Sequence, residues 1–275
     1  MSIPNTEKRN PQSMHMDKMS TEEMAALVIS ANYDAVRAAE EAIESISKAV
    51  DAIAEAFNEG HRLIYIGAGT SGRLGVIDAS ECPPTFGVSY DQVQGIIAGG
   101  NDRMFRAAEN AEDKYENGQK DVKDIGLEGG DVLVGISAAG NPSYVLGAID
   151  YAKSIGCVTV GVCNNSDALL LKATDIPIFL DTGAEVLTGS TRLKAGTAQK
   201  IVLNALSTCA MTKTGKVYEN MMINLSPSNK KLRERVIRIV CELLSCSEEE
   251  AIKRLNENGW VIRRAVEAAK NEQNH

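Results

Sequence analysis

The stretch GAGTSGRLGVIDASECPPTF at residues 67–86 decides the fold, because it turns an apolar strand into a helix within a few residues. It directly follows RLIYI at 62–66, a short apolar run typical of a buried strand. Glycines at such a turn let the backbone N–H groups at the start of a helix converge on a phosphate group. The stretch therefore predicts a strand, a phosphate-binding turn and a helix.

Short apolar runs alternate with helix-like stretches after this turn. The runs are QVQGIIAGG (92–100), DVLVGIS (131–137), VTVGVCN (158–164) and IPIFLD (176–181). Several of them are apolar at both parities, as expected for parallel strands covered on both faces. We therefore predict an α/β protein with a doubly wound, mainly parallel sheet, whose site lies beyond the carboxyl ends of the strands.

Helical patterns surround this core. Residues 1–19 have no periodicity and predict an extended arm, and Ser20 opens a capping box before two helices that end at Gly60. A long helix closing at Gly215 follows the last strand, and then a helix and a helical pair, the pair capped by Ser247. We expect an arm with helices at 1–50, the main domain at 51–215 and a C-terminal helical region at 216–275.

Composition excludes several classes of protein. The 275 residues can bury a large core, and the net charge of −8 gives no basic footprint for nucleic acid or an anionic membrane. The six cysteines lack metal-ligand and secreted-scaffold spacing, and the three histidines are not paired. No apolar run approaches the ~20 residues of a membrane span. We expect a cytoplasmic protein that needs no metal or cofactor.

Three loops at predicted strand ends combine small residues with hydroxyl groups: GAGTSGR at 67–73, SAAGNPS at 137–143 and TGSTRLKAG at 188–196. Each predicts an anion cradle at a helix N-terminus, suited to a phosphate monoester. The residues expected to bind the ligand's phosphate are Gly69, Thr70, Ser71, Ser137, Gly140, Asn141 and Ser190, with Lys194 or Lys231 as the counter-charge. Glu185 is expected to bind hydroxyl groups if the ligand is a sugar.

A nucleotide is the alternative ligand, since GAGTSG satisfies the dinucleotide fingerprint. That fingerprint needs an acidic residue about 20 positions further on, at the end of the second strand, to bind a ribose. Here Asp102 lies about 30 residues beyond Gly72, and Cys-Pro-Pro at 82–84 is expected to interrupt the helix just after Glu81. The spacing therefore favours a phosphosugar.

Long segments of the chain resemble the N-acetylmuramic acid 6-phosphate etherase family. They include DASECPPTFG, NAED, GSTRLKAGTAQK and the N-terminal NPQSMHMDKMST, and the resemblance covers nearly the whole chain. One loop differs, because relatives usually have serine, glycine and threonine where this chain has Ala139, Gly140, Asn141 and Pro142. We expect Ser137 and Ser143 to supply the hydroxyl groups there.

The resemblance implies a sugar-isomerase (SIS) domain in a homodimer that cleaves the D-lactyl ether of N-acetylmuramic acid 6-phosphate. It places the catalytic glutamates at Glu81 and Glu112 and suggests Lys231 as a third participant. On the resemblance alone, Glu81 protonates the leaving oxygen and Glu112 is the base. Two alternatives remain open at this point: an aldose–ketose phosphate isomerase, and a regulatory protein that binds phosphosugars without turnover.

Overall fold

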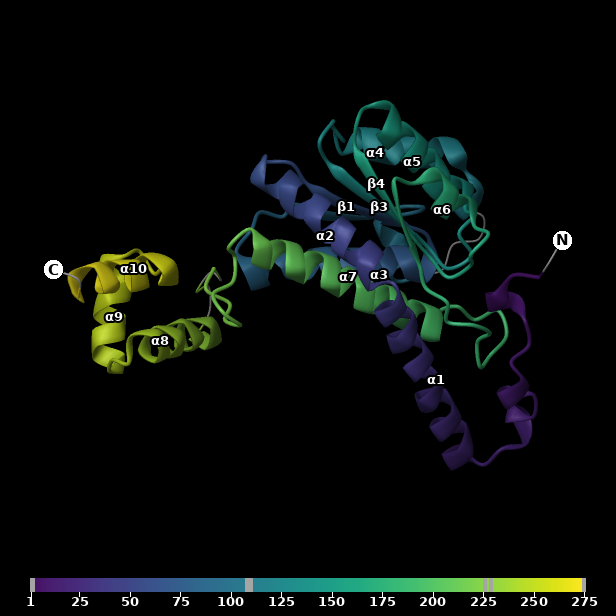
Figure 1. Ribbon diagram of the computed structural model, residues 1–275, viewed down its shortest axis with the longest axis horizontal. Helices are drawn as coiled ribbons and strands as arrows, with labels where there is room; N and C mark the ends of the chain where they lie inside the picture. Colours follow the sequence, from purple (N-terminus) through teal and green to yellow (C-terminus); the bar gives the residue numbers. More distant parts are fainter. Residues whose placement is uncertain (1–2, 107–110, 225–226, 228–229, 274–275) are drawn as a thin grey trace. The chain divides into compact units, whose positions relative to one another are not determined.

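The computed structural model describes residues 3–106, 111–224, 227 and 230–273 (Figure 1). The chain forms two compact units, one made of residues 1–80 and 91–210 and the other of residues 81–90 and 211–275. Each unit contains its own cluster of buried apolar side chains.

Five parallel strands form the sheet of the first unit, in the order β2-β1-β3-β4-β5. Their bounds are β1 Leu63–Gly67, β2 Val93–Ile97, β3 Val132–Ser137, β4 Val158–Cys163 and β5 Ile176–Phe179. The predicted doubly wound parallel sheet is confirmed. Gly67 pairs with both Ile97 and Ile136, so β1, β2 and β3 end level with one another. The strand order reverses between β1 and β3, the place where such sheets form ligand sites.

Helices cover both faces of this sheet (Figure 1). One face carries α4 (Tyr115–Asp124), α5 (Ser143–Ser154) and α6 (Leu169–Ala173), whose apolar residues share a core cluster with β1 and β3. The other carries α2 (Ile43–Asn58), α3 (Gly69–Phe86) and α7 (Lys194–Lys213). Tyr65 points to this second face, where its hydroxyl donates to Asp78 Oδ2 on α3 at 2.9 Å. Burial on both faces explains why the strands are apolar at both parities.

The N-terminal arm is anchored to loops at the carboxyl ends of β4 and β5. It contains three short 3-10 turns, at Asn5–Glu7, Pro11–Ser13 and Met16–Lys18. Asn165 Nδ2 donates to the buried Thr6 Oγ1 at 3.1 Å, and Asn10 Nδ2 donates to the Ala184 carbonyl at 3.2 Å. The predicted capping box is confirmed, since Ser20 exchanges hydrogen bonds with Glu23 at the start of α1 (Thr21–Glu41).

The expected interruption of the helix after Glu81 is wrong. Helix α3 continues through Pro83 and Pro84 to Phe86. Proline removes a backbone donor, but its fixed φ is compatible with a helix. Helix α3 therefore continues although the two prolines each remove one hydrogen bond. The helix ends instead at Gly87, where φ is +64° and the N–H donates to the Pro83 carbonyl. The Cys-Pro-Pro segment therefore does not favour a phosphosugar over a nucleotide, and only the position of Asp102 does.

Among the described residues of the second unit, α8 (Lys230–Leu244), α9 (Glu248–Glu257) and α10 (Ile262–Gln273) form the predicted helix and helical pair. They pack around a buried apolar cluster that includes Val236, Leu255 and Val266. Ser247 caps α9, because its Oγ accepts from the Glu250 N–H at 3.3 Å. The helices thus make a small core of their own.

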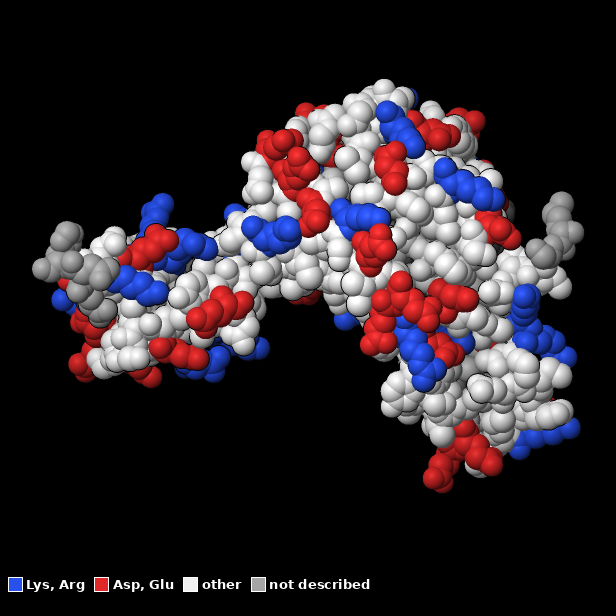
Figure 2. All heavy atoms as spheres, viewed as in Figure 1, with Lys and Arg blue, Asp and Glu red and all other residues white. Residues whose placement is uncertain are grey.

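The surface mixes both signs of charge. Figure 2 shows Lys and Arg side chains interspersed with Asp and Glu over the face in view.

The short 3-10 turns η4 (Asn101–Met104) and η5 (Ala111–Asp113) follow β2. Among the described residues, none of the helices has the length and apolar character required to cross a bilayer.

Candidate active site

The first predicted loop brings the start of α3 against the end of β1. A Cβ on Gly72 would lie 2.5 Å from the Gly67 carbonyl oxygen, and one on Gly67 would lie 2.7 Å from the Gly72 nitrogen. Both positions therefore require glycine. Gly69 has φ +53° at the first position of the helix, a conformation that glycine adopts without strain. The fingerprint glycines thus set a close strand-to-helix turn.

This turn leaves the first amides of α3 open. Within the described residues, the N–H groups of Gly69, Thr70 and Ser71 have no hydrogen-bond partner, and the Thr70 hydroxyl has none either. The first bond of the helix runs from the Gly72 N–H to the Ala68 carbonyl at 3.2 Å. Unpaired amides at a helix N-terminus attract an anion through their dipoles. The start of α3 therefore has the geometry of a phosphate cradle.

The second loop leads from β3 into α5 and is folded around its own side chains. Ser137 Oγ accepts from the Gly140 N–H at 2.9 Å, and Asn141 Oδ1 accepts from the Leu169 N–H at 2.8 Å. Gly140 has φ +79°, and a Cβ there would lie 2.3 Å from the Cys163 Sγ and the Ala168 Cβ. Asn141 therefore ties this loop to α6 through its oxygen. The Ser137 hydroxyl hydrogen has no acceptor among the described residues.

The third loop departs from the predicted anion cradle, because the chain fills it with its own carboxylate. Glu185 is fully buried, and its two oxygens accept from the Lys194 N–H at 3.2 Å and the Ala195 N–H at 2.9 Å. The next two amides donate to the Thr191 and Leu193 carbonyls. The start of α7 is therefore closed to an external anion, and both Glu185 oxygens cap a helix.

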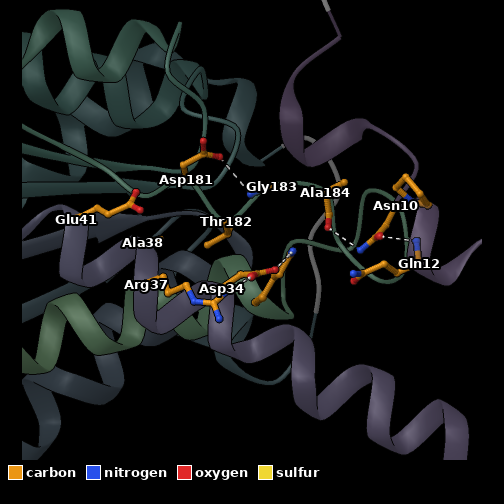
Figure 3. A pocket seen from close by; sticks show the side chains of 12 residues that line it. Asn10, Gln12, Asp34, Arg37, Ala38, Glu41, Asp181, Thr182, Gly183 and Ala184 are labelled. Atoms are coloured by element: carbon orange, nitrogen blue, oxygen red, sulfur yellow. Dashed lines mark hydrogen bonds and ion pairs between the residues drawn. The ribbon is translucent and has the colours of Figure 1, made fainter.

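The Lys194 side chain is also committed. This side chain is 4% exposed, and its ammonium lies 2.9 Å from Asp34 Oδ2 on α1, while Arg37 lies 3.6 Å from the other Asp34 oxygen. These residues line a polar cavity of about 410 Å³ together with Glu41 and Asp181 (Figure 3). The contact with Asp34 supports a structural role for Lys194; its direct contact with phosphate stays a prediction.

The remaining predicted residues occupy both units. Glu112 is exposed on η5, whose Ala111 packs in the same apolar cluster as Ala68 of the first loop. Ser190 is half-buried just before α7. Glu81, at the exposed surface of α3, and Lys231, exposed on α8, belong to the second unit. The first unit thus places the first two loops and Glu112 at the carboxyl edge of its sheet.

Two buried side chains that were not predicted as site residues join the first loop to α7 and to the end of β4. Gln199 of α7 accepts from the Ser71 hydroxyl at 2.8 Å and donates to Asn164 Oδ1 at 3.0 Å. Gln199 is 1% exposed and Asn164 is fully buried after β4. Their signal was present, since Gln199 interrupts an apolar helix and Asn164 ends the run VTVGVCN.

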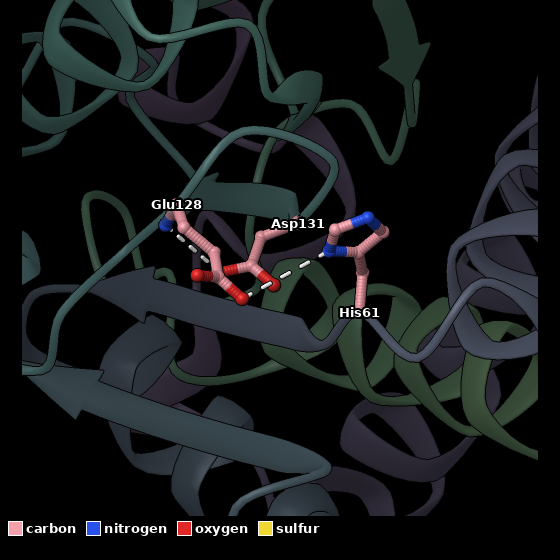
Figure 4. Close-up of side chains that lie close together, drawn as sticks. All are labelled: His61, Glu128 and Asp131. Carbon is pink, nitrogen blue, oxygen red and sulfur yellow. Dashed lines mark hydrogen bonds and ion pairs between the residues drawn. The ribbon is translucent and has the colours of Figure 1, made fainter.

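A group of possible metal ligands lies at the opposite edge of the sheet. His61, Glu128 and Asp131 place ligand atoms within 4.8 Å of one another, before β1 and β3 (Figure 4). Asp131 is fully buried, and both its oxygens accept from the Arg62 guanidinium, the shorter contact being 2.6 Å. Because Arg62 already supplies a positive charge, the geometry favours an ion pair that joins the starts of the two strands.

Comparison with known proteins agrees with this fold. A family model described as the glucokinase regulatory protein N-terminal SIS domain matches residues 45–153. The structure is similar to a phosphoheptose isomerase from Francisella tularensis, with a TM-score of 0.53 and 16% identity over 70% of this chain and 100% of that one. At that identity the likeness concerns the fold alone. The fold is that of an SIS domain.

Relatives of higher identity define the family. An N-acetylmuramic acid 6-phosphate etherase from Pasteurella multocida (strain Pm70) is 48% identical over 95% of this chain and 87% of its own length. One from Clostridium botulinum (strain Hall / ATCC 3502 / NCTC 13319 / Type A) is 49% identical over 95% and 86%. The chain belongs to the N-acetylmuramic acid 6-phosphate etherase family and is an enzyme.

Proposed function

We propose that this enzyme cleaves the D-lactyl ether of N-acetylmuramic acid 6-phosphate, giving N-acetylglucosamine 6-phosphate and D-lactate in the recycling of cell-wall amino sugars. The identity of about half of the residues with named etherases carries the proposal. The open start of α3 supports it, because a terminal phosphate needs amide donors of this kind. The likeness to an isomerase concerns the fold alone and the regulatory-protein model matches residues 45–153 only, so neither alternative is favoured.

The phosphate lies, in this proposal, between the first turns of α3 and α5. The amides of Gly69, Thr70 and Ser71 provide donors on one side, and the Ser137 hydroxyl and the Gly140–Asn141 loop provide the other wall. Ser190 and Lys231 are proposed as further contacts with the sugar phosphate. Residues 51–215 would then constitute the substrate-binding SIS domain, between the arm with helices at 1–50 and the helical region at 216–275.

The chemistry needs one acid and one base. In the open-chain sugar the C1 aldehyde acidifies the proton on C2, and the base removes it while the C3–O bond breaks. The C2–H electron pair becomes the C2=C3 bond, and the acid protonates the departing lactate oxygen. Water then adds at C3 and the proton returns to C2. We propose Glu81 as the acid and Glu112 as the base.

Replacement of Glu81 tests the assignment. Glu81→Gln removes the proton donor, so we expect D-lactate release to fall by roughly 100-fold or more. Thermal protection by N-acetylglucosamine 6-phosphate should remain, because the phosphate loops are intact. Glu116→Gln, at an exposed glutamate of α4, is the matched control and should keep near-normal turnover. Near-normal lactate release by Glu81→Gln would refute the catalytic role of this residue.

We also propose a homodimer, because an apolar stripe on α1 is exposed. Ile29, Tyr33 and Val36 are 68%, 66% and 45% exposed at helical spacing. Exposed stripes of this kind mark interaction surfaces in globular proteins. Sedimentation equilibrium of the full chain measures the assembly, and a monomer at all concentrations would refute the dimer.

The remaining parts of the proposal concern location and other partners. Six free thiols support a cytoplasmic location, where cysteines stay reduced. The net charge of −8 supports an enzyme whose partners do not include nucleic acid or membrane lipid.

A further inference from the structure

The hydrogen bonds behind the first phosphate loop have only one consistent direction. Asn164 Nδ2 donates to the Leu180 carbonyl at 3.1 Å. A carbonyl oxygen can only accept, so the Asn164 amide is oriented with its nitrogen toward Leu180 and its oxygen toward Gln199. Gln199 must then present its nitrogen to Asn164 at 3.0 Å and its oxygen to Ser71. The Leu180 carbonyl thus fixes both amides.

This orientation commits the hydrogen of the Ser71 hydroxyl. Ser71 Oγ lies 2.8 Å from Gln199 Oε1, which has only lone pairs to offer, so the serine must donate. The oxygen of Ser71 keeps only its own lone pairs toward the site. A phosphate dianion also presents lone pairs, and the two would repel each other. The Thr70 hydroxyl, by contrast, has no partner among the described residues.

We propose that Gln199 and Asn164 are positioning residues of the phosphate site, which they serve by fastening Ser71 and the first turn of α3. In this assignment the Ser71 side chain does not donate to the substrate. The phosphate is bound by the amides of that turn and by the Thr70 hydroxyl. The inference rests on the proposed function, because it concerns how the proposed phosphate loop is held.

Burial makes the loss of any bond in this chain costly. Ser71, Gln199 and Asn164 are 7%, 1% and 0% exposed, so water cannot replace a lost partner. Moving the serine hydrogen to a ligand would leave the Gln199 oxygen buried without a donor. The chain of bonds also joins three elements, the start of α3, α7 and the end of β4, so its loss would let the amides of the cradle diverge. Misplacement of binding groups raises KM without changing the chemical step.

Gln199→Met distinguishes this assignment from direct donation by Ser71. The two hypotheses predict opposite changes in the affinity for phosphate. Methionine removes the acceptor and releases the serine hydroxyl. If Ser71 bound phosphate directly, phosphate should bind as tightly as before or more tightly. We expect instead that the Ki of inorganic phosphate in the D-lactate assay rises about 10-fold, as does KM, while kcat changes by less than about 3-fold. The rise in melting temperature with added phosphate should shrink in parallel.

Further variants complete the design. Ser71→Ala should add little in the Gln199→Met background, because the serine acts through Gln199. Ser207→Ala is the matched control, since Ser207 Oγ donates to Asp78 Oδ1 at 3.2 Å in the same seam between α3 and α7. It should leave the Ki of phosphate unchanged. If Gln199→Met fails to fold, Asn164→Ala removes the next bond of the chain and should still weaken phosphate.

The outcomes distinguish this inference from the proposed function. Thr70→Val should weaken inorganic phosphate whether or not Gln199 positions the loop. If Thr70→Val weakens phosphate and Gln199→Met does not, the positioning role is wrong and the phosphate site stands. If neither variant weakens phosphate, the proposed phosphate site is wrong as well.

Discussion

The first turns of α3 and α7 follow similar sequences but have opposite chemistry. Both helices begin after a loop rich in glycine, serine and threonine, and both run along the same face of the sheet. The amides of α3 are open, whereas those of α7 bind the buried carboxylate of Glu185. A helix start is therefore a ligand site only where the chain has not supplied its own anion.

The two helices also have different roles, because α7 is fixed by side chains of the protein and α3 presents open amides. Helix α7 is fixed at its start by Glu185 and at Lys194 by Asp34. Through Gln199 and Ser71, this fixed helix holds the open turn of α3. The cap by Glu185 and the contact with Ser71 lie at different points of α7, so each can be tested separately. Three perturbations test this division, in order of expected size.

Gly72→Ala should have the largest effect, because it closes the α3 turn from within. The added Cβ would lie 2.5 Å from the Gly67 carbonyl oxygen and 2.9 Å from the side chain of Ile97, so strand and helix must separate. We expect kcat/KM for D-lactate release to fall at least about 100-fold, since small displacements of a binding turn are costly. Overpacking should also cost about 1–3 kcal/mol of unfolding free energy.

Gly60→Ala is the control for this substitution. Gly60 also has positive φ, at +88°, but a Cβ there would have open space. It should lose some stability and keep its activity. Equal losses of activity in Gly72→Ala and Gly60→Ala would show that the close approach at α3 does not matter.

The sequence predicted the open helix start better than the closed one. Strand positions, the order of helices and the glycine turn follow from apolar runs and short-range steric rules, and the structure confirms them. The partner of the α7 amides could not be predicted in the same way. Glu185 and Ala195 are ten residues apart in an irregular loop, and nothing in the local pattern fixes where that carboxylate points.

Long-range polar contacts escaped the sequence analysis for the same reason. Ser71 and Gln199 are 128 positions apart, and Gln199 and Asn164 are 35 apart. Their pairing depends on how α7 lies across the sheet, which no local periodicity specifies. The helix through Pro83 and Pro84 was missed because a general rule about proline was applied without knowing the contacts that support this helix.

Glu185→Ala should have the second-largest effect, and it should act on stability rather than on the phosphate site. It leaves two buried amides without an acceptor, which costs about 1–3 kcal/mol. For a chain of this size we expect the melting temperature to fall by roughly 3–10 °C. Below that temperature the Ki of inorganic phosphate should stay within about 3-fold of wild type, because the α3 amides are unchanged.

Formate sharpens this test. In Glu185→Ala a small carboxylate can reach the exposed α7 amides, so formate should restore part of the lost melting temperature. Chloride at the same ionic strength is the control. A large rise in the Ki of phosphate without a loss of stability would mean that Glu185 belongs to the substrate site and does not merely cap α7.

The smallest expected effect is the pH dependence that Glu185 contributes. Burial raises the pKa of this carboxyl above its ordinary 4.5, although the Ala195 and Lys194 amides oppose the rise. A carboxyl group with a raised pKa binds its proton more tightly in the folded than in the unfolded state. Its contribution to stability is therefore present below pH 4.5 and is lost as the pH rises through the folded-state pKa.

The glutamine of Glu185→Gln cannot titrate. The difference in unfolding free energy between the wild type and this variant therefore isolates the contribution of Glu185. We expect the free energy of unfolding of the wild type, relative to Glu185→Gln, to decline from pH 4.5 toward neutrality. The slope cannot exceed about 1.4 kcal/mol per pH unit for one group. Denaturant titrations at several pH values measure it, with the exposed Glu40→Gln as the surface control. A difference that grows with pH would mean that the α7 amides outweigh burial, so that the closed helix start favours the charged form of its carboxylate.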